Sequence, residues 1–363
     1  SYIPGIKYKH MKHKELLKLV DDLDENGEET VEHKRVLMID GLNLFFRNFA
    51  MMNMVNPEGV HIGGLGGFFR SLGALIRKID PTHVYVIFDG AGSSNSRKNL
   101  LPEYKSGRDL QRITNWDAFD DLEDEHDAKV DQMVRIIQYL KTLPVKTITL
   151  PKVEADDVIA YLAGIIPEKP EDKVFIVSSD KDFLQLINQN IIVYRPMEKN
   201  FYTEKTVVEK FKMDPENLII YKTLLGDNSD KVKGVKGLGE KGLYKRFPEL
   251  SEGKVTLDDI YDICEKRFND HQELKAQGSK EKFPIVYARI IQHIEELRTN
   301  YKIMDLSNPM LDSKDKEYLK NRVETKDYHY IPDQFVAFYN EDKLGGMIRN
   351  VEFWVKDIFE SLK

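Results

Sequence analysis

Five short apolar runs, separated by segments with helical spacing, constrain the fold of this chain more than any other feature. The runs are residues 36–39, 83–88, 145–150, 174–177 and 191–194. Between them, apolar residues recur at helical spacing, as in Phe68, Leu72, Leu75 and Ile76. Short runs that are apolar at nearly every position are typical of strands buried on both faces, and their alternation with helices favours a parallel sheet. We therefore predict the α/β class, with a central, mostly parallel sheet flanked by helices.

The 363 residues are too many for one small core, so we expect a main domain with attachments. We predict a charged N-terminal extension over residues 1–34 and an α/β core over 35–213. An insertion at about 93–128, with few core-type positions, leaves the sheet and returns to it. A helical region is expected over 214–300, followed by a C-terminal helical segment over 301–363.

Composition excludes several classes of protein. Hydrophobic residues make up 41% and charged residues 32%, which fits a globular protein without a membrane span. The charged N-terminus lacks the apolar core of a signal peptide. The single cysteine, Cys264, excludes an internal disulfide and a cysteine-based zinc cluster, so we expect a cytoplasmic location. The net charge of −7 is only weak evidence against nucleic-acid binding, because the distribution of charge matters more.

Acidic residues follow several of the predicted strands. Asp40 and Asp89 each come directly after a run, and the pair Asp180 and Asp182 follows the fourth run. Further acids stand at Glu154, Asp156 and Asp157 after the third run, and at Asp227 and Asp230 in the helical region. Ligands of open α/β sheets bind beyond the carboxyl ends of the strands, so these groups are expected to converge.

A lone strand-end aspartate is more often a helix cap or turn residue than a metal ligand. That interpretation is favoured for Asp40 taken alone, and it is as good as the metal interpretation for Asp157 and Asp227. It does not explain the whole set, since independent caps have no reason to follow successive buried strands. Converging carboxylates need compensating cations, and oxygen-only ligands favour Mg²⁺ or Mn²⁺ over zinc. Two such ions about 3.5–4 Å apart can hydrolyse a phosphodiester.

The start of the insertion is basic. It contains Arg97, Lys98, Lys105 and Arg108 around the aromatic Tyr104. Arginine and lysine hold phosphates, and tyrosine can stack on an exposed base. A charge run is usually only a solvated face, but its position directly after a strand-end acid favours a functional role. The acidic stretch that follows, residues 117–125, would repel DNA.

A glycine-rich segment lies in the helical region. Residues 237–242 match the dinucleotide pattern G-x-G-x-x-G, but they follow a predicted helix rather than a strand, so a nucleotide site is not expected. The segment is better interpreted as a glycine turn between two helices, residues 234–239, whose backbone N–H groups can face phosphates. A plain connection between helices is the alternative. The residues proposed to bind DNA here are Lys231, Lys233, Gly234, Lys236, Gly237, Gly239 and Lys241.

Taken together, these segments resemble the flap endonuclease/5′-3′ exonuclease family. The matching pieces are Ile39-Asp40-Gly41-Leu42-Asn43, Phe88-Asp89-Gly90, Leu101-Pro102-Glu103-Tyr104-Lys105, Val153-Glu154-Ala155-Asp156-Asp157, Ser179-Asp180-Lys181-Asp182-Phe183 and Gly226-Asp227 through Gly242. They occur in the family's order and cover roughly residues 35–250. Within the family, the chain looks most similar to the T-even phage ribonuclease H type, through Thr114-Asn115-Trp116, Ser178-Ser179-Asp180, Arg195-Pro196-Met197-Glu198-Lys199 and Tyr330-Ile331-Pro332-Asp333.

The resemblance implies roles that the residues alone do not show. Asp40, Asp89, Glu154 and Asp156 would bind one metal ion. Asp180, Asp182 and Asp230 would bind or bridge to a second, with Asp157 and Asp227 supporting through water. Arg97 and Lys98 would steer the scissile phosphate, and Arg47 would reach it too. Residues 93–128 would form a helical arch for the 5′ strand, and the glycine turn would grip duplex phosphate with a bound K⁺ on its backbone carbonyls.

The expected activity is metal-dependent cleavage near a free 5′ end, in DNA flaps, nicks or duplexes or in RNA–DNA hybrids, during replication primer removal or repair. A single-strand-binding protein or a sliding clamp is a candidate partner, and a monomer is expected. Two alternatives stay open. A non-catalytic DNA-binding protein would have no need of the full acid set, and a PIN-like ribonuclease would have no need of the basic glycine turn.

Overall fold

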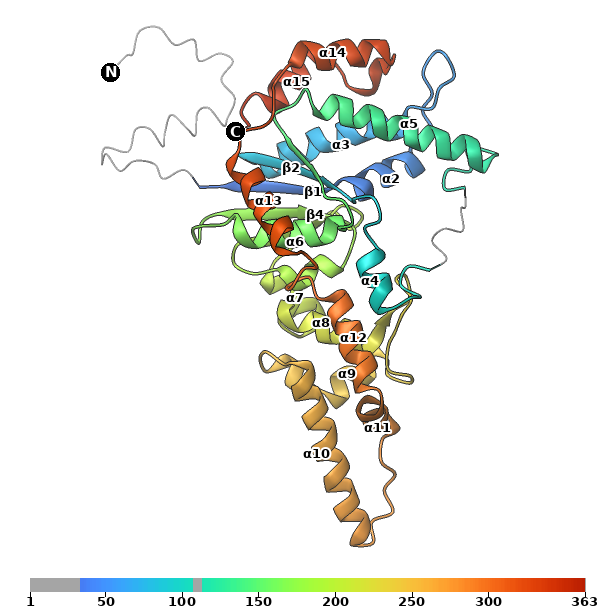
Figure 1. The fold of residues 1–363 in the computed structure, drawn as a ribbon, viewed down its shortest axis with the longest axis vertical. Coiled ribbons are helices and arrows are strands. Elements are labelled where there is room, and N and C mark those ends of the chain that lie inside the picture. The colour runs from blue at the N-terminus through green and yellow to red at the C-terminus, as the bar shows by residue number, and fades with distance from the viewer. Residues whose placement is uncertain (1–32, 107–112, 363) are drawn as a thin grey trace, which may run out of the picture. The chain divides into compact units, whose positions relative to one another are not determined.

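The computed structural model describes residues 33–106 and 113–362, and residues 34–363 form one compact unit. The predicted extension, residues 1–34, lies almost wholly outside the described residues. The centre of the unit is a six-stranded sheet with the order β3-β2-β1-β4-β5-β6 (Figure 1). The strands are β1 (Arg35–Asp40), β2 (His83–Phe88), β3 (Lys146–Thr149), β4 (Lys173–Val177), β5 (Ile191–Arg195) and β6 (Asn200–Tyr202). The first five are parallel and β6 is antiparallel, which confirms the predicted fold class.

Each strand buries alternate residues in two separate cores. In β1, Val36 and Met38 belong to one hydrophobic cluster, while Leu37 and Ile39 belong to the other. The side chains of a strand point to opposite faces in turn, and both faces here are covered by helices. This is why the strands appear in the sequence as continuous apolar runs.

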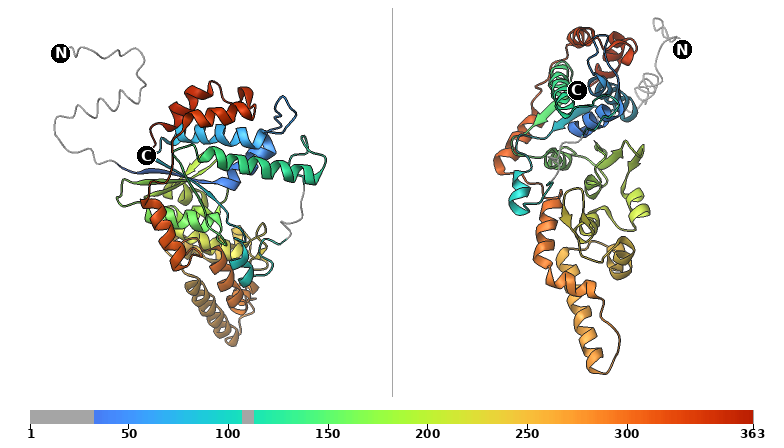
Figure 2. Two further views of the ribbon diagram at one scale, coloured as in Figure 1. Left: turned by 45° about the horizontal axis from the view of Figure 1, so that its top comes forward. Right: turned by 90° about the vertical axis from the view of Figure 1, so that its right-hand side faces the viewer.

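One face of the sheet is covered by helices from both ends of the described chain (Figures 1 and 2). They are α2 (Gly41–Met51), α3 (Gly63–Ile79), α5 (Leu122–Leu140), α14 (Pro332–Glu341) and α15 (Val351–Phe359). Trp354 of α15 packs against Phe335 and Phe359, and its ring leaves no room for a side chain at Gly73 of α3. The C-terminal helices are therefore part of this core.

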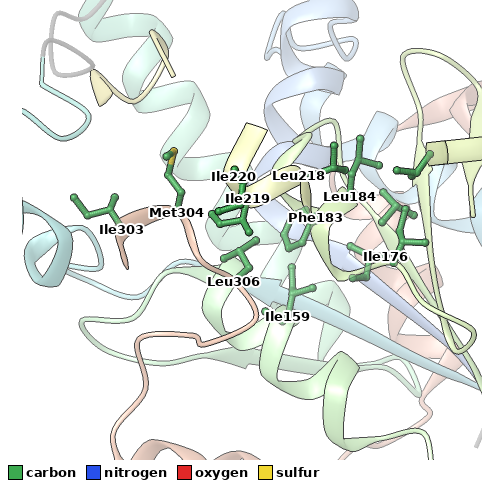
Figure 3. Packing of buried hydrophobic residues seen from close by; sticks show 14 of the residues in the cluster. Ile159, Ile176, Phe183, Leu184, Leu218, Ile219, Ile220, Ile303, Met304 and Leu306 are labelled. Carbon is green, nitrogen blue, oxygen red and sulfur yellow. The ribbon is translucent and has the colours of Figure 1, made fainter. Parts of the chain in front are cut away.

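A second set of helices contributes to the core on the other side of the sheet. They are α6 (Ala155–Ile165), α7 (Glu204–Phe211), α8 (Leu218–Leu225), α9 (Glu240–Arg246), α10 (Leu257–Ala276), α11 (Ile285–Gln292), α12 (Ile294–Met304) and α13 (Ser313–Glu324). Figure 3 shows how this core brings together segments that are distant in the sequence. Ile176 of β4, Ile159 of α6 and Leu218 of α8 belong to the same cluster as Ile303, Met304 and Leu306. This packing fixes α6 and α8 beside the carboxyl end of the sheet.

The insertion is anchored at both of its described ends. Its first part contains α4 (Asn95–Leu100), and its last part leads into α5. Glu125, one of the acids that were expected to repel DNA, is buried and accepts hydrogen bonds from the backbone of Thr114 and Asn115. Asp121 caps α5 by accepting from two backbone N–H groups. Much of the acidic run therefore serves the start of a 19-residue helix, where negative charge is favourable.

Candidate active site

Seven carboxylates line one cavity of about 730 Å³ at the carboxyl end of the sheet. They are Asp40, Asp89, Asp156, Asp180, Asp182, Asp227 and Asp230. Strand β1 lies between β2 and β4, where the order of the sheet reverses, and the acids that follow these three strands meet at that point. This is the place where open α/β sheets bind their ligands.

Backbone N–H groups hold three of these acids in place. Asp40 is the N-cap of α2, and its Oδ1 accepts a hydrogen bond from the backbone N–H of Asn43 at 3.0 Å. Asp89 accepts from the backbone N–H of Ala155 at 2.6 Å, at the start of α6. Asp180 accepts from the backbone N–H of Asp182 at 2.8 Å. For Asp40, the cap interpretation and the cavity interpretation therefore hold together.

The acids at the bottom of the cavity repel one another. Burial raises the pKa of Asp40 to about 6, and the negative charges of Asp89 and Asp180 add to the rise. Burial also raises the pKa of Asp156 well above its usual range, again with help from Asp180 and Asp40. Nearby positive charge would therefore favour the ionised forms of these groups.

A second group of acids lies in the same cavity. Carboxylate oxygens of Asp182, Asp227 and Asp230 lie within 4.8 Å of one another, which suits a shared cation. The ammonium of Lys222, on α8, pairs with Asp182 and lies 2.9 Å from Asp227. Although burial opposes the effect, Lys222 and Ser229 hold the pKa of Asp227 well below its usual range.

Arg97 does not face the cavity, which corrects its predicted contact with the scissile phosphate. Its side chain is 3% exposed, and Nη1 donates to Glu154 at 2.7 Å and to Asp157 at 2.6 Å. Its Nε donates to the carbonyl of Ile303 at 2.8 Å. A guanidinium that donates in three directions inside the protein cannot also reach a phosphate. Arg97 instead fastens the base of the insertion to α6 and to the end of α12.

Three other predicted site residues share this buried network. Tyr104 is 3% exposed and donates its hydroxyl to Glu154 at 3.2 Å, so it cannot stack on an exposed base. Both oxygens of Asp157 accept from Arg97, and one also accepts from the backbone of Met310. Neither Glu154 nor Asp157 lines the cavity. Arg97 and Lys105 compensate part of their charge, and their role in the metal site stays a prediction.

Of the other predicted cations, Lys105 comes nearest to the acids. It lines the cavity, and its ammonium lies 2.7 Å from Glu154. Lys98 and Arg47 are half-buried and do not line the cavity, so their roles stay predictions. Arg108 lies outside the described residues.

The glycine turn follows a two-stranded hairpin of β7 (Gly226–Asp227) and β8 (Val232–Lys233), and leads into α9. Gly237 has a φ of +82°, a conformation that favours glycine. Lys231, Lys233, Lys236 and Lys241 are all exposed. The predicted turn is thus present and basic, although a short hairpin intervenes between it and α8.

A scan of family models places residues 35–212 in the 5′-3′ exonuclease N-terminal resolvase-like domain. A 5′-3′ exonuclease of Aquifex aeolicus is 35% identical over 209 residues, which are 57% of this chain and 67% of the relative. One from Bacillus subtilis is 31% identical over 240 residues, which are 63% of this chain and 75% of the relative. The chain belongs to the 5′-3′ exonuclease family. It is a nuclease, as the acid set and the ordered motifs predicted.

Other relatives of this chain are much longer. The DNA polymerase I of Bacillus subtilis is 31% identical over 253 residues, which are 68% of this chain but 27% of the polymerase. Among solved structures, a zinc-bound phage T5 5′-exonuclease matches with a TM-score of 0.58 and 22% identity, over 85% of this chain and 99% of the other. A phage T5 flap endonuclease with DNA and metal ions matches with a TM-score of 0.57 and 22% identity, over 90% and 98%. These likenesses show a shared fold. The closer resemblance to the phage ribonuclease H type stays a prediction.

Sequence reasoning missed several residues that line the cavity, and three of them bear on its chemistry. Lys222 pairs with two of the acids, and its place one helical turn before Gly226-Asp227 is the signal that could have found it. Arg195 donates to the carbonyl of Ser179 at 2.9 Å, next to Asp180. Phe46 is exposed on α2, nearly two turns after the Asp40 cap. No described helix has the length and apolar character needed to cross a membrane.

Proposed function

We propose that this nuclease is a structure-specific 5′-nuclease that hydrolyses phosphodiester bonds near the 5′ end of DNA flaps, nicks and duplexes, and of RNA–DNA hybrids, with two divalent cations. The observation that carries the proposal is the convergence of seven carboxylates on one cavity. The raised pKa values of Asp40 and Asp156 show that this set is costly for the chain to ionise on its own. Such a cost is expected where the protein is built to hold cations.

The donor set fits hard divalent ions. The acids offer oxygen alone, which favours Mg²⁺ or Mn²⁺ over softer metals. Asp40, Asp89, Asp156 and Asp180 would hold one ion, and Asp182, Asp227 and Asp230 the other. When bound, the two ions supply an activated water and stabilise the leaving oxygen of the phosphodiester.

The chain's own residues would orient the substrate. Lys105 is the lysine of the insertion that lines the cavity, and its charge favours a phosphate close to the acids. Lys222 balances the charge of Asp182 and Asp227. Phe46 offers an exposed ring on which a base next to the cleaved bond can stack.

Duplex DNA would be gripped away from the cavity. The exposed Lys233, Lys236 and Lys241 surround the glycine turn and can neutralise backbone phosphates. Binding of this kind is independent of sequence, which suits an enzyme that recognises the structure of its substrate. We further propose that the protein acts as a monomer in the cytoplasm, in primer removal or repair. A single-strand-binding protein or a sliding clamp would be its partner.

The test is a cleavage assay with a 5′-labelled flap in Mg²⁺, compared with the same flap carrying a bulky protein on its 5′ end and with a circular single strand. We expect rapid cutting of the free flap, and strong inhibition when the end is blocked before mixing or absent. Equal cutting of all three would leave a nuclease without dependence on the 5′ end and would contradict the proposal.

A further inference from the structure

Two side chains from neighbouring helices donate hydrogen bonds to the backbone around the glycine turn. Asn300 of α12 donates its Nδ2 to the carbonyl of Lys233 at 2.8 Å. Arg289 of α11 donates its Nη1 to the carbonyl of Lys236 at 2.6 Å. Asn300 is buried and Arg289 is half-buried, so both side chains belong to the support of the turn. Together with Gln292 and His293 they line a cavity of about 270 Å³ against the turn.

These contacts bear on the K⁺ ion that was expected at this turn. A monovalent cation held by backbone carbonyls needs oxygens whose lone pairs are directed at it. Here the carbonyls of Lys233 and Lys236 already accept protein donors, and the carbonyl of Val235 accepts the backbone N–H of Leu238 at 3.0 Å. Arg289 also fixes a positive charge on the turn, and a second cation beside it would be repelled. With three of its carbonyls engaged and a guanidinium fixed beside them, the turn does not fit a bound K⁺.

We propose that Arg289 and Asn300 take the place of a monovalent cation: they hold the glycine turn in its duplex-binding conformation, so that duplex binding needs no K⁺. The inference rests on the proposed function, in which the turn grips duplex DNA. Arg289 and Asn300 are positioning residues in this account, because they act on the turn and not on the phosphate. The planar guanidinium can keep one direction on a carbonyl, whereas a lysine ammonium would hold it less firmly.

The glycine at position 237 fits the same role. A Cβ atom placed there would lie 2.9 Å from Nη1 of Arg289, so any larger residue would press on the guanidinium. The positive φ of Gly237 gives a second reason for glycine at this position. Gly237 thus allows both the conformation of the turn and the position of the Arg289 guanidinium against it.

The first experiment measures duplex affinity of the full chain, with Ca²⁺ in place of Mg²⁺ to prevent cleavage, in potassium, sodium and choline chloride at equal ionic strength. We expect the three dissociation constants to agree within about twofold. The variant Arg289→Met should bind about tenfold more weakly in choline, and K⁺ should recover part of that loss. Arg289→Lys should fall between the two.

The matched control is Arg298→Met, which removes the same charge from α12. Arg298 pairs with Asp258 and Glu295 and is not among the residues that support the turn. Because Arg289 is not itself a phosphate contact, Arg289→Met should leave the slope of log affinity against log salt unchanged, whereas a lost contact would lower it by about 0.9.

A second experiment needs no DNA. Hydrogen exchange of the amides in residues 234–239 should be the same in potassium and choline for the wild type, and should become dependent on potassium in Arg289→Met. Wild-type exchange that slows in potassium, or wild-type duplex binding more than about threefold tighter in potassium than in choline, would overturn the inference, and neither result requires the variant to fold. If the turn does not bind duplex at all, affinity will survive loss of its lysines while the exchange result still stands, so the two failures can be told apart.

Discussion

At the scale of single residues, the charged groups near a basic or acidic side chain decide whether that side chain is buried or lines the cavity. Arg97 and Lys105 start from the same basic stretch, yet Arg97 is buried against Glu154 and Asp157 while Lys105 lines the cavity. The acids divide in the same way. Glu154 and Asp157 are matched by protein cations, whereas the pKa values of Asp40 and Asp156 are raised by burial and by the neighbouring acids.

Asp40→Asn should separate catalysis from stability. We expect single-turnover cleavage to slow by about 100-fold or more, because a metal ligand is lost. A carboxyl with a raised folded-state pKa stabilises the protein below its usual pKa and loses that effect as pH rises through about 6. At pH 7.5 without metal, the variant should therefore gain on the order of 1–3 kcal/mol, measured by urea unfolding in EDTA. Asp180→Asn should slow cleavage similarly, and Asp270→Asn, on the exposed side of α10, should change neither quantity.

Arg97→Met should act on folding. Removing the guanidinium leaves Glu154 and Asp157 buried without their partner, which should cost about 3–5 kcal/mol of unfolding free energy. Urea unfolding in EDTA measures the loss, and Lys98→Ala should stay within about 0.5 kcal/mol of the wild type. If Arg97→Met keeps wild-type stability but loses cleavage, Arg97 contacts the substrate and its buried role is wrong.

At the scale of secondary-structure elements, we expect the glycine turn to bind duplex DNA and the loops that carry the acids to perform the cleavage. Helix α8 connects the two, because its Lys222 faces the acids and its C-terminus leads into β7, β8 and the turn. The exposed lysines of the turn lie outside the residues that line the acid cavity. Binding and chemistry should therefore respond to separate mutations.

Replacing Lys233, Lys236 and Lys241 together with alanine tests this division. We expect weaker duplex binding and a slope of log affinity against log salt that is lower by about 0.9 for each lost phosphate contact. Single-turnover cleavage at saturating DNA should change much less, because the acids are untouched. Alanine at three exposed lysines elsewhere should leave the slope nearly unchanged; suitable positions are Lys314, Lys320 and Lys326. An unchanged slope in the turn variant would show that duplex DNA binds elsewhere.

At the scale of the whole described unit, the C-terminal segment joins the two cores. Leu319 of α13 belongs to the core on the α6 side of the sheet, and Phe335 and Trp354 belong to the core on the opposite side. The chain thus passes from one face to the other after α13 (Figure 1). The C-terminal helical segment is therefore built into the packing of the sheet.

Trp354→Ala should therefore destabilise the whole unit. Truncating a buried tryptophan leaves a cavity and should cost about 3–5 kcal/mol. Urea unfolding should be monitored by far-UV circular dichroism and, separately, by the loss of cleavage activity. Both signals should show one cooperative transition, at a lower urea concentration than in the wild type. Lys356→Ala, an exposed change in the same helix, should stay within about 0.5 kcal/mol. Loss of α15 alone, with the sheet unaffected, would contradict this view of the C-terminal segment.

The sequence predicted what depends on local pattern. Strands buried on both faces produce continuous apolar runs, so the sheet and the acids at its carboxyl end could be foreseen. It did not predict what depends on distant partners. The burial of Arg97 requires Glu154 and Asp157, 57 and 60 residues away, and the role of Lys222 requires Asp182, 40 residues away. The composition of a basic stretch cannot distinguish a lysine that faces a cavity from an arginine that is buried beneath it.

The most direct test of the central claim is the dependence of single-turnover cleavage on divalent metal. A 5′-labelled flap should be stable with the metal-free enzyme in EDTA, and addition of Mg²⁺ or Mn²⁺ in excess of the chelator should start cleavage. The same addition should have little effect on Asp40→Asn, because one of the acids that hold the cations is missing. Full activity in excess EDTA, or normal cleavage by Asp40→Asn and Asp180→Asn in Mg²⁺, would contradict the assignment of the acid cavity as the active site.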